Sequence, residues 1–166
     1  MILAIYLWGS FFLYGFLAMV DPGIVPCHAH VQSTKSGIIC VMQTEENKKT
    51  AIDFLELVVG GKIDEAFEKY IDMSGKHHNA FTPAGMGALL EGMKGAEAQF
   101  PNQKFKIQHA LANDNIVAIH SHLIMKEKEL EMITVHVFKI EGGKIVEMWD
   151  CGQNIVGATT NSDGAF

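Results

Sequence analysis

From residue 104 onward, apolar and polar residues alternate with a period of two, which predicts β-strands. Turn-forming residues interrupt the alternation at 113–115 (Asn-Asp-Asn) and at Gly142-Gly143. We therefore expect four consecutive antiparallel strands, at residues 104–112, 116–126, 131–140 and 144–155.

The clearest hairpin pattern surrounds Gly142-Gly143, where two alternating segments meet. The number of residues in the turn decides which side chains share a face of the sheet. A two-residue turn would place His136 opposite Trp149 and leave Asp150 on the other face. A three-residue turn would pair His136 with Met148 and place His136 and Asp150 on the same face. The residue pattern leaves both registers open.

Ahead of the strands, apolar residues recur every three or four positions, as on one face of an α-helix. Thr44 is the expected N-cap of the first helix, which Gly60-Gly61 ends. A short helix follows, and a third is expected with Thr82 as its N-cap and Pro83 at its first helical position. Residues 71–81 show no period and are expected to be irregular. Helices first and strands afterwards indicate an α+β domain whose helices cover one face of a curved sheet.

The segment 2–20 carries no charge and is almost wholly apolar. As a helix it would span roughly 28 Å, close to the hydrocarbon thickness of a bilayer. It is either a transmembrane helix or a dispensable leader, with the native start at Met42. The expected location is cytoplasmic, with membrane anchoring through 2–20 as the alternative. The expected organisation is a leader and linker at 1–41, a domain at 42–156, and a flexible tail at 157–166.

The composition fits a single compact domain, because the chain has 166 residues of which 48% are hydrophobic. A net charge of −6 and the absence of any basic run exclude a nucleic-acid partner. Cys27, Cys40 and Cys151 show neither a disulfide framework nor the spacing of a zinc site, which favours a reducing compartment.

Asp150 follows Trp149 in an otherwise apolar strand, where a carboxylate is costly to bury unless it has a partner or a function. Such an acid can serve as a general acid or base, or as a structural group at a strand end. His120 and His122 lie two residues apart on one strand, so they share a face. Imidazoles can polarise a carbonyl or exchange a proton near neutral pH. Alternatively, zinc or iron could be bound by His120, His122, His136 and Asp150.

Four segments of the chain together resemble a known group of proteins. They are the opening helix at 44–70, His77-His78-Asn79, VAIHSH at 117–122, and VHVFKIEGGKIVEMWDCGQ at 135–153. With these segments the chain resembles the SnoaL-like (polyketide-cyclase-like) group of the nuclear transport factor 2-like superfamily. The resemblance implies a cone-shaped α+β fold, with N-terminal helices packed on a curved antiparallel sheet around a pocket.

The resemblance also implies which residues reach the pocket. Asp150 would point into it, and the expected catalytic residues are Asp150, His136, His122 and His120. The expected substrate-binding residues are His78, Asn79, Met148 and Trp149. His136 occupies a position that is often an acid in related isomerases and cyclases, so it need not play their role.

We therefore expect an enzyme that applies acid–base chemistry to a hydrophobic carbonyl compound, by aldol cyclisation, isomerisation or hydration. No cofactor and no metal are expected. The expected partners are a small hydrophobic molecule and a second copy of the chain, which would dimerise through the outer sheet face at Ile133, Val135 and Val137. The alternative is a non-catalytic ligand-binding or dimerisation module, because a fold does not determine a function.

Overall fold

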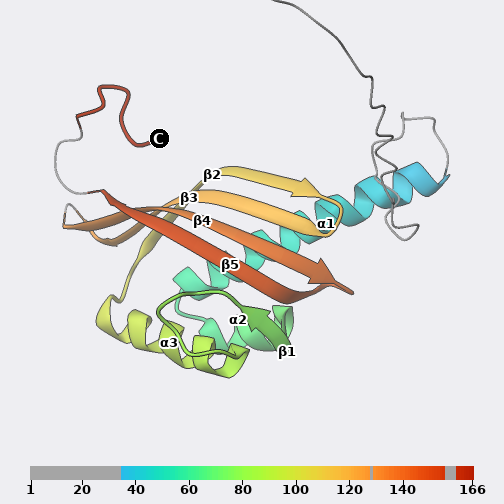
Figure 1. Ribbon diagram of the computed structural model, residues 1–166, viewed down its shortest axis with the longest axis horizontal. Helices are drawn as coiled ribbons and strands as arrows, with labels where there is room; N and C mark the ends of the chain where they lie inside the picture. The colour runs from blue at the N-terminus through green and yellow to red at the C-terminus, as the bar shows by residue number, and fades with distance from the viewer. Residues whose placement is uncertain (1–34, 128, 156–159) are drawn as a thin grey trace, which may run out of the picture.

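The computed structural model describes residues 35–127, 129–155 and 160–166, so the predicted leader lies almost wholly outside the described residues. Three helices and five strands follow one another along the chain (Figure 1). The helices are α1 (Lys35–Val59), α2 (Ile63–Tyr70) and α3 (Met86–Gln99). The strands are β1 (Ile71–His77), β2 (Lys104–Asn113), β3 (Ile116–Lys126), β4 (Leu130–Glu141) and β5 (Lys144–Ile155).

The sheet has the strand order β1-β5-β4-β3-β2 and is open. The four strands β2 to β5 form the predicted antiparallel meander, whereas β1 pairs in parallel with β5. The predicted α+β fold is therefore confirmed, but the sheet is mixed rather than wholly antiparallel.

β1 was not predicted from the sequence, because residues 71–81 were expected to be irregular. Its register on β5 shifts between Ile71 and Lys76, and this irregularity removes the period of two. Gly75 lies within the shift, where a Cβ atom would stand 2.4 Å from the carbonyl oxygen of Val146. The lack of a side chain at Gly75 therefore allows the backbones of β1 and β5 to meet there.

The first helix begins earlier than predicted. α1 starts at Lys35, so Thr44 is not its N-cap but lies inside it, where its hydroxyl donates to the carbonyl of Cys40 one turn earlier (3.0 Å). Threonine is common at N-caps but also occurs inside helices with this hydrogen bond, so the prediction of Thr44 as the N-cap is wrong. Further along α1, the buried Asn47 donates to the carbonyl of Asp114 (3.0 Å) and joins the helix to the β2–β3 turn.

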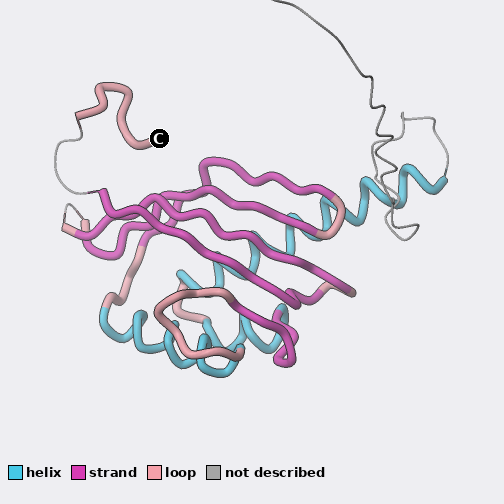
Figure 2. Tube along the Cα trace, in the orientation of Figure 1, coloured by secondary structure: helices cyan, strands magenta, loops and turns pink. Residues whose placement is uncertain are grey.

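The hydrophobic core lies between the helices and one face of the sheet, called here the inner face; the opposite one is the outer face. Figure 2 shows the helices gathered on one side of the strands. Phe54 of α1 packs against Phe67 of α2 and Phe138 of β4, at centroid distances of 5.8 and 5.9 Å. The sheet side of the core consists of Ile71, Val117, Ile119, Phe138, Ile140, Ile145 and Met148.

No helix within the described ranges is long and apolar enough to cross a bilayer. The segment 2–20 lies outside those ranges, so its anchoring role and the cytoplasmic location stay predictions. Cys151 is free and exposed, and the Sγ atom of Cys40 lies 4.0 Å from Asp114 Oδ1. The reducing compartment expected from the cysteines stays a prediction.

Candidate active site

The β4–β5 hairpin has a two-residue turn followed by a β-bulge. Glu141 pairs with Lys144 across Gly142-Gly143, and both glycines have positive φ (57° and 77°), as a tight hairpin turn requires. Ile140 then pairs with Ile145, but Lys139 pairs with Glu147, so Val146 is an extra residue in β5. The bulge displaces every later residue of β5 by one place relative to β4.

Because of this bulge, His136 lies directly opposite Asp150. Neither predicted pairing of His136 is observed, since the turn has two residues but the bulge then changes the register. Phe138 and Met148, which also pair with each other, belong to the core. Residues two positions apart on a strand share a face, so His136 and Asp150 both point to the inner face.

The His136 ring is held within the protein beside Phe138, with centroids 6.1 Å apart and planes 8° apart. Its Nδ1 atom is buried and has no hydrogen-bond partner among the described residues. Burial lowers the pKa of His136, and the negative charge of Asp150 opposes that shift. His136 is therefore a neutral imidazole at neutral pH, with a polar atom that a ligand could satisfy.

Asp150 is exposed and is held by Asn79, whose Nδ2 donates to its Oδ2 (2.8 Å). Asn79 is itself fixed by the loop after β1. Its Oδ1 accepts from the backbone N–H of Phe81 (2.9 Å), and its own N–H lies 3.3 Å from His77 Nδ1. His77 Nε2 donates to the carbonyl of Pro83 (2.9 Å), so Nδ1 is left to accept from Asn79.

A second buried polar pair lies on the inner face and was not singled out from the sequence. The hydroxyls of Ser121 on β3 and Thr134 on β4 are 2.8 Å apart. These residues are 0% and 6% exposed. Thr134 is two residues from His136, so Ser121, Thr134 and His136 are neighbouring polar residues on the otherwise apolar inner face. The alternation of side chains along β4 could have predicted the position of Thr134, because Thr134, His136 and Phe138 share one face.

His120 and His122 do share a face, as predicted, but it is the outer one. Their neighbours Ile119 and Ser121 are fully buried on the inner face. His122 Nε2 lies 2.8 Å from Glu131 Oε2. The expectation that both histidines converge on Asp150 is therefore wrong, because alternation tells which residues share a face and not which face is covered.

The alternative metal site is not assembled either. Its four proposed ligands are divided between two faces of the sheet, two on each. Within the described part of the chain, no group of three or more His, Cys, Asp or Glu residues is arranged to hold a metal ion.

Of the expected substrate-binding residues, only Asn79 lies against Asp150. The His78 ring stacks on Trp149 (centroids 5.0 Å, planes 4° apart), and its Nε2 lies 2.8 Å from Glu147. Trp149 pairs with Val137, which places it on the outer face. Met148 points to the inner face but is 2% exposed and belongs to the core.

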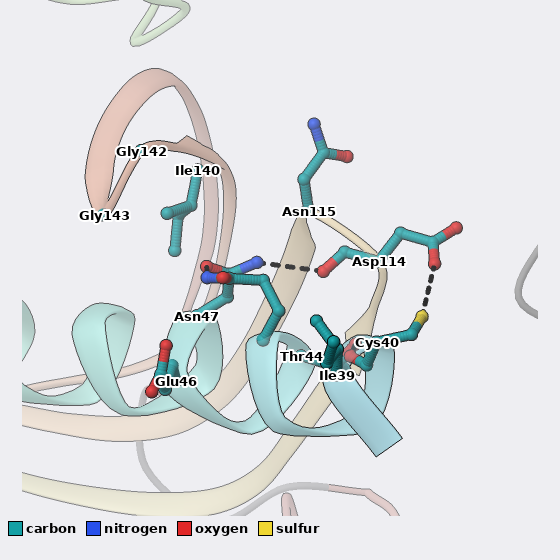
Figure 3. Close-up of a pocket in the computed structure, with 11 residues that line it drawn as sticks. Ile39, Cys40, Thr44, Glu46, Asn47, Asp114, Asn115, Ile140, Gly142 and Gly143 are labelled. Carbon is teal, nitrogen blue, oxygen red and sulfur yellow. Dashed lines mark hydrogen bonds between the residues drawn. The ribbon is translucent and has the colours of Figure 1, made fainter. Parts of the chain in front are cut away.

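A hollow of about 610 Å³ lies near the start of β5, between α1 and the β2–β3 and β4–β5 turns (Figure 3). Asn47 points into this region and spans it to Asp114, while Gln43 donates to the Asn47 side chain (3.1 Å). The side chains of Gln43 and Asn47 and the carbonyl of Asp114 bond to one another. The candidate active site is the Asp150–His136 pair, because it contains a buried ring nitrogen without a partner among the described residues.

The sequence profile of SnoaL-like polyketide cyclases matches residues 49–157 of the chain. This range contains His136, Asp150 and Asn79. No match was found among curated proteins.

Solved structures share the fold. A protein from Jannaschia sp. CCS1 described as a SnoaL-like polyketide cyclase has a TM-score of 0.58 and 12% identity, over 66% of this chain and 87% of that one. One from Acidithiobacillus ferrooxidans described as a polyketide cyclase has a TM-score of 0.55 and 24% identity, over 64% and 87%. An LEH-like epoxide hydrolase from M. tuberculosis has a TM-score of 0.55 and 16% identity, over 66% and 84%. At these identities, the likeness shows the fold alone.

Proposed function

Since the chain belongs to the SnoaL-like polyketide cyclase family, we propose that it is an enzyme moving a proton beside the carbonyl of a hydrophobic small molecule. One observation carries this proposal. Asp150 and His136 are directly paired on the inner face, and the buried Nδ1 of His136 has no partner among the described residues. A carboxylate beside a neutral imidazole is a donor set suited to enolate chemistry.

In the proposed reaction, the Asp150 carboxylate takes a proton from the carbon next to the carbonyl. The electron pair of that C–H bond moves onto the carbonyl oxygen and forms an enolate. His136 donates a hydrogen bond from its neutral ring to this oxygen, which stabilises the developing charge away from bulk water. In a conjugated enolate, Asp150 can then return the proton at another carbon. Alternatively, the enolate carbon can attack a second carbonyl and close a ring, and Asp150 returns the proton to the new alkoxide.

Asn79 is proposed to position the base, because its amide donates to Asp150 from a loop that its other hydrogen bonds hold in place. The chemistry described needs no cofactor. A cyclase and an epoxide hydrolase are among the structures sharing this fold, and proton transfer by a carboxylate on the inner face fits both reaction types. His120 and His122 have no part in the proposal.

The test is exchange of α-protons for deuterium in D₂O, followed by NMR over a panel of hydrophobic cyclic ketones and β-keto esters. Exchange reports proton abstraction even when the later step is unknown. For a compound that the protein exchanges, Asp150→Asn should lower the rate by about 10²–10⁴-fold. Asp163→Asn, an exposed acid in the C-terminal loop, is the matched control and should have no effect. Full exchange by a folded Asp150→Asn protein would refute the assignment.

Homodimerisation through the outer face is part of the same proposal. Two large hydrophobic residues on that face, Leu111 and Ile116, are 69% and 38% exposed. Ile133, Val135 and Val137 lie further along it. Light scattering of the purified protein gives its mass directly. A monomer at high protein concentration would contradict the dimer.

A further inference from the structure

A pair of histidines on the outer face has no role in the proposed reaction. His109 on β2 and His120 on β3 are direct cross-strand partners. Their Nδ1 atoms are 3.2 Å apart, their ring planes differ by 4°, and the centroids are 5.5 Å apart. This combination means that the rings meet edge to edge with the two nitrogens facing each other, and not face to face.

A second β-bulge creates this pair. Ile107 pairs with Ser121, but His109 pairs with His120, so Gln108 is an extra residue in β2. Without it, His109 would lie opposite Ile119 and point to the inner face. The bulge therefore turns the His109 imidazole outward and onto the edge of His120.

We propose that His109 and His120 form a binding site for a divalent transition cation of the Zn²⁺ class, with water completing the coordination. Imidazole nitrogen is a preferred ligand of such cations. Two nitrogens bound to one tetrahedral Zn²⁺ at about 2.05 Å lie roughly 3.3 Å apart, close to the separation observed. The two ligands are therefore held at chelating distance before any cation arrives.

Chelation requires a proton shift and a small movement. In the neutral pair, one Nδ1 carries the hydrogen that the other accepts. When the cation binds, that ring must carry its proton on Nε2 instead, so both Nδ1 lone pairs become ligands and no net proton is released. His109 is exposed and can swing so that the two lone pairs converge.

The surroundings hold His120, and the site lies on the face proposed above for dimerisation. Phe166 stacks on His120 and His122, at centroid distances of 5.9 and 4.5 Å. His122 is engaged by Glu131, and Lys106 is its cross-strand partner on β2. The site is thus made of two imidazoles, in keeping with the lack of a three-residue metal cluster in the described ranges. His122 supplies a matched control on the same face.

The experiment is a titration of the full-length protein with Zn²⁺ alone near pH 7.5, followed by long-range ¹H–¹⁵N NMR of the imidazoles. The Nδ1 signals of His109 and His120 should shift together as Zn²⁺ is added. His109→Gln should weaken the apparent affinity for Zn²⁺, measured from the His120 signal, at least tenfold. His122→Gln should leave that affinity unchanged.

Nδ1 signals of His109 and His120 that stay unperturbed at millimolar Zn²⁺ would overturn the proposal. So would an unchanged affinity at His120 in folded His109→Gln protein. Because the readout is site-specific, neither result depends on whether Asp150 is a catalytic base.

Discussion

Asp150 on β5 lies directly opposite His136 on β4, although the turn between their strands has only two residues. The extra residue Val146 makes this pairing possible, and Gly75 on β1 makes room for the carbonyl of Val146. The geometry of the candidate site therefore depends on three strands, of which only two carry its side chains.

Replacing Asn79 with alanine should lower the α-proton exchange rate about tenfold, or ~1.4 kcal/mol, because Asp150 loses a charge-assisted hydrogen bond. The rate is measured on the same ketone as for Asp150→Asn. Gln153→Ala, which removes an exposed amide from the outer face of β5, is the control. Equal rates for the Asn79 and Gln153 variants would show that Asn79 does not position the base.

His136 should make the fold less stable as the pH falls. Above about pH 6.5 the imidazole is neutral in both the folded and unfolded states. Burial lowers the pKa of His136 in the folded state, so below pH 6.5 the unfolded chain binds a proton that the folded protein does not. The free energy of unfolding then falls until the pH reaches the lowered pKa, below which the loss is constant.

Denaturant titrations between pH 7.5 and 5 would measure this effect, with His136→Phe as the comparison. The difference in unfolding free energy between the two proteins should change only below about pH 6.5. Asp150→Asn removes the opposing charge, lowers the pKa of His136 further, and should extend the window to lower pH. A pH-independent difference between wild type and His136→Phe would contradict the burial argument.

Gly75→Ala should destabilise the fold by about 1–3 kcal/mol, because the new methyl group would stand 2.4 Å from the carbonyl oxygen of Val146. Gly95→Ala is the control, since that glycine lies in α3 with open space at its Cβ position. It should stabilise by about 0.5–1 kcal/mol. Thermal unfolding distinguishes the two. Similar effects at both positions would mean that β1 and β5 do not meet as closely as described.

Substitutions of Ser121 and Thr134 should have non-additive effects on the free energy of unfolding. Removing either hydroxyl alone, by Ser121→Ala or Thr134→Val, leaves a buried hydroxyl without its partner and should cost about 1–3 kcal/mol. The double variant should cost less than the sum of the two. A double-mutant cycle on unfolding free energies measures the difference, and strict additivity would show that the hydroxyls do not depend on each other.

The full-length chain and a chain beginning at Met42 should both be found in the soluble fraction after membrane fractionation. Removing the residues before Met42 shortens α1 and takes away the exposed Ile39 and Val41 together with the half-buried Cys40. Recovery of only the full-length chain in the membrane fraction would establish residues 2–20 as an anchor.

Much of the fold could be predicted from periodicity. The four strands after residue 104 and the turn at Gly142-Gly143 have strong alternation and glycine signals, and all are observed. β1 was not predictable in this way, because the shift around Gly75 breaks its alternation and its pairing partner is 70 residues or more away. Its existence depends on tertiary contacts.

The site was predictable only in part. Asp150 and His136 were identified by residue type and resemblance, but the face they share depends on Val146, an ordinary strand residue with no turn or bulge signal. His120 and His122 carried the same chemical signal as His136. They lie on the other side of the sheet because Ile119 and Ser121, not they, meet the helices.

Because of the bulge at Val146, the number of residues between Gly143 and Glu147 determines which side chains form the site. Loss of one residue between Gly143 and Glu147 would bring Trp149 to the inner face opposite His136 and turn Asp150 outward, with every side chain unchanged. When this chain is aligned with its relatives, a single gap in that interval therefore decides whether a Trp-Asp sequence corresponds to an inward acid or an inward aromatic ring.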